Sequence, residues 1–118
     1  MREADLQDAI IEMAGFLGWM VAHFRPARTD KGWRTPVSAD GKGFPDLVMV
    51  HPVQRRLLFA ELKAEKGKLS PEQQAWIGAL SRVTPLGMAE LYVWFPTDWT
   101  SGEIERCLRG QVDQLPAL

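Results

Sequence analysis

The sequence is poor in the residues that build covalent or metal-based scaffolds. It contains one cysteine, Cys107, and two histidines, His23 and His51. A single cysteine excludes an intramolecular disulfide and a cysteine cluster that holds a metal, and two scattered histidines do not make a zinc site. Proteins without disulfides are typical of reducing compartments, so we expect a cytoplasmic protein.

Long apolar runs are also absent. No stretch approaches the ~18 consecutive apolar residues that indicate a membrane-spanning helix, and the acidic, amphipathic segment 1–8 does not resemble a signal peptide. The 118 residues are 46% hydrophobic and 25% charged, which is ordinary for one globular domain. We therefore expect a single soluble domain with no membrane partner.

The chain has almost no net charge, but its charges are unevenly distributed. The formal net charge is -1, from 14 Lys and Arg against 15 Asp and Glu. Residues 23–68 hold ten basic residues and five acids, a formal +5, whereas the rest holds four Arg and ten acids, a formal −6. A near-neutral protein is not an obvious nucleic-acid binder. The basic segment is compatible with a polyanion partner, but on the charge pattern alone a solvated surface explains it as well.

Hydrophobic periodicity predicts a mixed α/β fold. Apolar residues at helical spacing predict a helix over 3–17 that ends at Gly18. Short apolar runs predict strands over 19–24, 47–50, 57–63 and 90–95, the second and third forming a hairpin, and a last helix reaches Arg109. Residues 25–44 are expected to form a long loop, so the elements predict a mixed central sheet flanked by helices.

The start of another helix is marked strongly. Ser70 is a favourable N-cap, Pro71 suits the first helical position, and Gln73 stands three residues after the cap, as a capping box requires. Trp76 and Leu80 give this helix an apolar face. It would connect the hairpin to the final strand.

The most informative pattern is Pro-Asp at 45–46 followed, fourteen residues later, by Glu-Leu-Lys at 61–63. Side chains alternate across a strand, so Glu61 and Lys63 share one face and Leu62 points to the other. Asp46 precedes the neighbouring strand and reaches the same edge. Two carboxylates, helped by the Leu62 carbonyl, suit Mg²⁺, and a lysine beside the ion orients or deprotonates a water for phosphodiester hydrolysis.

An ordinary interpretation of the same residues is a solvent-facing ion pair and a turn. Three further residues favour a site. Glu3 and Gln7 lie on the apolar stripe of the first helix and are expected to face the sheet, and Gln73 is placed to point back over the end of the Glu61 strand. Helix-end charge and capping explain Glu3 and Gln73 equally well at this point.

The ordered motifs resemble the VRR-NUC branch of the PD-(D/E)xK nuclease superfamily over residues 1–96. The motifs are Glu3-x-x-x-Gln7, Gly43-Phe-Pro45-Asp46-Leu47, Glu61-Leu-Lys63 and Leu69-Ser-Pro-Glu-Gln73-x-x-Trp76. The resemblance implies a restriction-endonuclease-like core with an α-β-β-β-α-β-α order. It implies a single nuclease domain over residues 1–110, and we expect 111–118 to be a flexible tail.

The resemblance also implies the chemistry. It implies Mg²⁺ or Mn²⁺ and no organic cofactor, with Asp46 and Glu61 as metal ligands beside the Leu62 carbonyl. Lys63 would be catalytic, Gln73 would support it, and Glu3 would assist, either as a ligand itself or through a water. Small members of this branch, from phages or bacteria, are similar to Holliday junction resolvases and act as homodimers. The implied location is therefore a bacterial or phage-infected cytoplasm.

On this interpretation the basic segment meets DNA. The candidate phosphate contacts are Arg25, Arg28, Lys31, Arg34 and Lys42, with Gln7 beside the site, Trp33 as a stacking residue, and Arg55 and Arg56 as further candidates. The expected function is a structure-specific DNA endonuclease that resolves four-way junctions. The alternatives are a flap, nicking or less specific nuclease of the same core, a catalytically silent DNA-binding module, and a structural protein with a surface ion pair.

Overall fold

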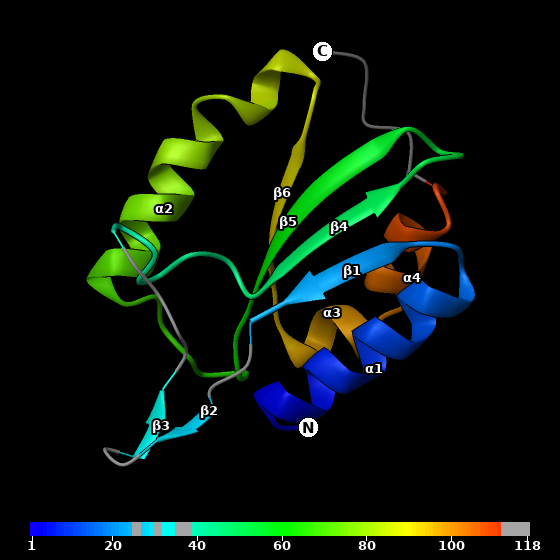
Figure 1. Ribbon diagram of the computed structural model, residues 1–118. Helices are drawn as coiled ribbons and strands as arrows, with labels where there is room; N and C mark the ends of the chain where they lie inside the picture. Colours follow the sequence, from blue (N-terminus) through cyan, green and yellow to red (C-terminus); the bar gives the residue numbers. More distant parts are fainter. Residues whose placement is uncertain (25–26, 30–31, 35–38, 112–118) are drawn as a thin grey trace.

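A computed structural model describes residues 1–24, 27–29, 32–34 and 39–111 of the chain (Figure 1). In chain order its elements are α1 (Glu3–Phe16), β1 (Met20–His23), β2 (Ala27–Thr29), β3 (Gly32–Arg34), β4 (Leu47–His51), β5 (Arg56–Leu62), α2 (Pro71–Ser81), the 3-10 helix η1 (Thr84–Leu86), β6 (Glu90–Trp94), α3 (Pro96–Thr100) and α4 (Glu103–Leu108). The predicted mixed α/β fold is confirmed. None of the described helices is long and apolar enough to cross a membrane.

Four strands form the central sheet in the order β1-β4-β5-β6. Strands β1, β4 and β5 pair antiparallel, so the predicted hairpin between β4 and β5 is confirmed. Strands β5 and β6 pair parallel, and a parallel pair needs a crossover connection. Helix α2 lies in that crossover, as the sequence predicts.

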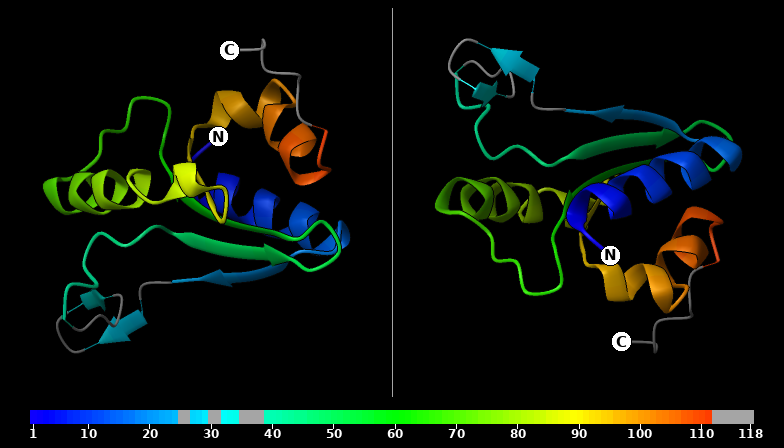
Figure 2. Two further views of the ribbon diagram at one scale, coloured as in Figure 1. Left: turned by 90° about the horizontal axis from the view of Figure 1, so that it is seen from above. Right: turned by 90° about the horizontal axis from the view of Figure 1, so that it is seen from below.

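Helices α1, α3 and α4 cover one face of the sheet, and α2 lies apart from them beside β6 (Figures 1 and 2). Alternate residues of β4 and β5, among them Leu47 and Leu58, are fully buried together with Leu6 and Ile10 of α1 and Ile104 of α4. Buried residues therefore recur at every second position along the strands and about every fourth position along α1, and these residues together form the core.

Helix α2 begins as the sequence predicts. Ser70 Oγ accepts a hydrogen bond from the Gln73 N–H, and the Gln73 side chain accepts one from the Ser70 N–H. Contrary to the expectation of an apolar buried face, no residue of α2 is fully buried. The aromatic ring of Phe44 instead bridges Trp76 of α2 and Phe59 of β5.

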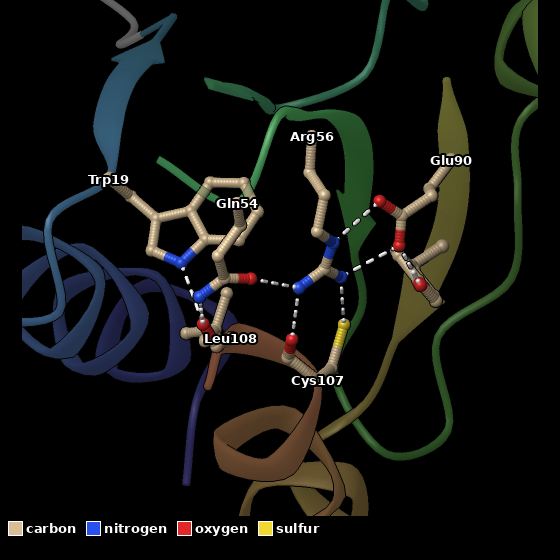
Figure 3. A network of polar contacts seen from close by, with 7 residues as sticks. Trp19, Gln54, Arg56, Glu90, Cys107 and Leu108 are labelled. Atoms are coloured by element: carbon tan, nitrogen blue, oxygen red, sulfur yellow. Dashed lines mark hydrogen bonds and ion pairs between the residues drawn. The ribbon is translucent and has the colours of Figure 1, made fainter. Parts of the chain in front are cut away.

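A polar network fastens α4 to the sheet (Figure 3). Both Glu90 carboxylate oxygens accept hydrogen bonds from Arg56, and the Cys107 carbonyl accepts another at 2.6 Å. Trp19 Nε1 donates to the Leu108 carbonyl at 2.9 Å, so carbonyls that the end of a helix leaves unpaired are satisfied. Arg56, a weaker candidate for DNA contact in the sequence, instead turns its guanidinium inward, with 15% of its side chain exposed.

Two further expectations are corrected. Residues 25–44 are not loop throughout, because β2 and β3 form a short antiparallel hairpin that stands apart from the main sheet (Figure 1). The segment after β6 contains α3 as well as α4, since Pro96 occupies a helix start and Asp98 accepts a hydrogen bond from the Phe95 N–H. The expected tail lies outside the described residues except for Gln111.

Candidate active site

The two predicted carboxylates meet where β4 begins and β5 ends. Leu47 pairs with Ala60 across the hairpin, so Asp46 lies opposite Glu61 on the next rung. Asp46 Oδ2 accepts a hydrogen bond from the Leu62 N–H at 2.8 Å. The buried Leu62 side chain joins the core on one face, whereas Glu61 points to the other face, as strand alternation predicts.

Gln73 ties Glu61 and Lys63 together from the first turn of α2. Its Nε2 donates a hydrogen bond to Glu61 Oε1 at 2.8 Å, and its Oε1 accepts one from Lys63 Nζ at 2.8 Å. Lys63 Nζ is also 3.6 Å from Glu61 Oε1. The Ser70 N–H donates to the same Gln73 Oε1, which fixes the orientation of the amide. The Gln73 side chain therefore caps α2 and also hydrogen-bonds both Glu61 and Lys63; its role in a catalytic site stays a prediction.

The site is short of positive charge for the carboxylates that it holds. Glu61 is 1% exposed, and burial followed by the nearby negative charge of Asp46 raises its pKa to about 8, although Lys63 acts in the opposite direction. Burial likewise raises the pKa of Asp46, while the Leu62 N–H lowers it. A buried carboxyl group beside a half-buried one favours a shared proton or a bound cation.

The donor set fits a hard divalent cation. Glu61 Oε2 is buried and has no hydrogen-bond partner among the described residues, and a buried polar atom without a partner is costly. Carboxylate and carbonyl oxygens are the ligands of Mg²⁺ and Mn²⁺. In the described part of the chain no three His, Cys, Asp or Glu side chains are grouped to hold a metal. The predicted ligand set of Asp46, Glu61 and the Leu62 carbonyl therefore contains only two side chains, and it stays a prediction.

Helix α1 places Glu3 differently from expectation. Glu3 is exposed rather than turned away from water, because it lies in the first turn of the helix, beyond the buried residue Leu6. Burial of part of its side chain and the charge of Asp46 raise the pKa of Glu3, and Lys63 lowers it. Glu3 is therefore close enough to interact with the charges of Asp46 and Lys63, although it is exposed at the rim of the site. Gln7 is half-buried one turn further along α1.

The candidate DNA contacts are only partly described. Arg25 and Lys31 lie outside the described residues. Arg28 and Arg34 lie on β2 and β3, where Arg28 pairs with Trp33. Lys42 is exposed and forms a 3.1 Å ion pair with Glu72, which the sequence did not predict. Two further exposed lysines, Lys66 and Lys68, follow β5 directly after the site. Their position in the sequence just after Lys63 marks them as additional candidates for DNA contact.

Comparison with protein families gives a match. A family model described as the VRR-NUC domain matches residues 25–92, which is more than half of the chain and contains Asp46, Glu61, Lys63 and Gln73. No curated protein and no solved structure matches the chain. The four-stranded mixed sheet flanked by helices is compatible with a PD-(D/E)xK nuclease core.

Proposed function

The chain belongs to the VRR-NUC family, whose domain is of nuclease type, and from that premise we propose that it is a divalent-metal-dependent DNA endonuclease. The observation that carries the proposal is the meeting of four side chains at the start of β4, the end of β5 and the first turn of α2: Asp46, Glu61, Lys63 and Gln73. An ordinary surface ion pair would not bury Glu61 to 1% exposure or leave a second carboxylate beside it.

Asp46, Glu61 and the Leu62 carbonyl would hold Mg²⁺ or Mn²⁺, the unpartnered Glu61 Oε2 providing a ligand atom. The ion, when bound, supplies Lewis acidity: it lowers the pKa of a water and offsets charge on a phosphate oxygen. Glu3, on the rim, is proposed to assist through a water rather than as a direct ligand.

Lys63 is proposed to act on the attacking water and the scissile phosphate. An ammonium group has three N–H donors, of which Gln73 Oε1 uses one, so Lys63 keeps donors for the water or a phosphate oxygen. Its 9% exposure keeps bulk water from competing for these hydrogen bonds. Hydrolysis adds the water oxygen to phosphorus and breaks one bridging P–O bond of the strand.

The substrate is proposed to be DNA held by its backbone. Arg28 and Arg34 on the β2–β3 hairpin, together with Arg25, Lys31 and Lys42, are the proposed phosphate contacts, with Gln7 beside the cut strand. Phosphate contacts recognise the shape of the backbone and not its sequence. This supports a structure-specific enzyme, and four-way junctions are the substrate that we propose first, ahead of flaps or nicked duplex.

A four-way junction is cut symmetrically by two active sites, so we propose that the protein acts as a homodimer. A surface suited to pairing lies on the sheet face opposite α1. There Met20 of β1 and Val50 of β4 are direct cross-strand neighbours, and they are 69% and 39% exposed. We propose that these exposed apolar neighbours lie at the centre of the pairing surface.

The proposal is tested by incubating the protein with end-labelled four-way junctions, flaps and linear duplex of matched sequence. Each substrate is assayed with Mg²⁺, with Mn²⁺ and with EDTA. We expect cleavage with either ion, none with EDTA, and the fastest cleavage on the four-way junction. Equal rates on all three DNAs would favour the less specific nuclease, and binding without cleavage would favour the silent module.

A further inference from the structure

The segment that carries Asp46 is fastened to the first two turns of α2. Trp76 Nε1 donates a hydrogen bond to the Asp40 carbonyl at 2.9 Å. The rings of Phe44 and Trp76 meet edge to face with centroids 4.9 Å apart. Two separate elements of the site, the Asp46 segment and the Gln73 turn, are therefore held against each other.

Gly43 lies at the centre of this contact. Its φ is +86°, and a Cβ at this position would lie 2.5 Å from the Glu72 carbonyl carbon and 2.7 Å from the Gln73 nitrogen. These are backbone atoms, so they cannot rotate aside as the end of a side chain can. Any other residue at position 43 would push the start of α2 away from the Asp46 segment.

A displacement at this point acts directly on Gln73. The Gln73 nitrogen, which a Cβ at position 43 would press upon, is the atom that donates to Ser70 Oγ. The Gln73 side chain holds Glu61 and Lys63 at 2.8 Å each. Relieving a 2.5 Å contact needs a shift of about 1 Å, which is enough to break such hydrogen bonds and to cost on the order of a hundredfold in rate.

We propose that Gly43 is a positioning residue for the active site: by admitting the first turn of α2 against the Asp46 segment, it sets the Gln73 amide between Glu61 and Lys63. This role rests on the proposed nuclease function. Gly43 touches no reacting atom and acts through Gln73 alone.

The test compares Gly43→Ala with Gly87→Ala. Gly87 has a φ of +81° but no atom within 4 Å of an added Cβ, so its variant introduces the same backbone strain without the close contact. The first readout is the exchange rate of the Gln73 side-chain amide protons with water, measured by NMR without DNA or metal. We expect exchange at least tenfold faster in Gly43→Ala and changed by less than twofold in Gly87→Ala.

The second readout is cleavage kinetics. We expect Gly43→Ala to lower kcat at least tenfold with KM within twofold of wild type, and to add less than a twofold loss in a Gln73→Ala background. Unchanged amide exchange in Gly43→Ala, equal exchange in the two glycine variants, or additive losses with Gln73→Ala would overturn the role. A wild-type protein that cleaves no DNA would refute the proposed function, while the exchange measurement would still decide the position of Gln73.

If Gly43→Ala does not fold, Trp76→Phe replaces it. This variant removes the hydrogen bond to the Asp40 carbonyl, which holds the same two segments together, and keeps an aromatic ring against Phe44. We expect Gln73 side-chain exchange to become severalfold faster. Exchange at the wild-type rate would overturn the proposal.

Discussion

Gln73 Nε2 donates a hydrogen bond to Glu61 Oε1 over 2.8 Å. The direction of this bond is fixed, because the oxygen of the same amide is already engaged by the Ser70 N–H. Glu61 therefore faces a donor, and Lys63 faces an acceptor. The side chain that caps α2 thus also presents an N–H group to the carboxylate and an oxygen to the ammonium group.

The first prediction concerns Gln73→Glu. A glutamate three residues after Ser70 keeps the capping box, so the thermal midpoint should shift by no more than a few degrees. It removes the donor to Glu61 and places a third carboxylate in the site, so kcat should fall at least a hundredfold. Gln74→Glu, at the neighbouring exposed position, is the control and should keep wild-type kcat. Equal activity of the two variants would contradict this role of Gln73.

The second prediction concerns pH. The pKa of Glu61 is about 8 in the folded protein against 4.5 ordinarily, so the folded state binds a proton more tightly than the unfolded state. The proton on Glu61 therefore stabilises the folded state. This contribution is complete below pH 4.5 and is lost as the pH rises through 8. Urea unfolding in EDTA should therefore show stability falling between pH 5 and 8, with a smaller fall in Glu61→Gln. Parallel pH profiles for the two proteins would contradict the raised pKa.

The third prediction concerns Arg56. Replacing it by alanine leaves the half-buried Glu90 without its ion-pair partner, with the Tyr92 hydroxyl still donating to it, and frees the Cys107 carbonyl. The free energy of unfolding should therefore fall by about 3 kcal/mol. Arg55→Ala, at the exposed neighbouring position, should cost about 0.5 kcal/mol or less. Urea titration measures both. An equal loss in the two variants would mean that the network does not stabilise α4.

The fourth prediction concerns the β2–β3 hairpin. Reversing the charges of Arg28 and Arg34 should weaken DNA binding and reduce the slope of log affinity against log salt by about 2, since each phosphate contact contributes about 0.9. The control reverses Arg82 and Arg109, which follow α2 and α4 directly, and changes the net charge equally. An unchanged slope in the hairpin variant would remove the hairpin from the DNA interface.

The fifth prediction concerns the homodimer. Val50→Lys places a charge in the middle of the apolar pair with Met20 and should shift the protein from dimer to monomer in sedimentation equilibrium. Val53→Lys, at an exposed position in the turn after β4, should leave the dimer intact. A wild-type protein that is monomeric at all concentrations would contradict the proposed dimer.

Some of the site could be predicted because it depends on local rules. Alternation of side chains along β5 is sufficient to place Glu61 and Lys63 on the same face. The start of α2 is predicted by the neighbouring residues Ser70 and Pro71. The register of a hairpin then brings Asp46 to Glu61. These relationships need no knowledge of how distant segments pack.

Other features could not be predicted because they depend on tertiary contact. The sequence offers Arg55 and Arg56 side by side, and only the position of α4 decides that Arg56 turns inward. The exposure of Glu3 depends on where α1 begins relative to the sheet. The need for glycine at position 43 is visible only when α2 is seen to press upon it.

The most direct test of the central claim is the cleavage rate of a labelled four-way junction in Mg²⁺ by wild type, Asp46→Asn and Asp8→Asn. Asp8 is an exposed residue of α1 and provides the same chemical change away from the proposed ligands. We predict that Asp8→Asn cleaves at the wild-type rate and that Asp46→Asn is slower by a thousandfold or more. Cleavage by Asp46→Asn at the wild-type rate would contradict the assignment of the active site.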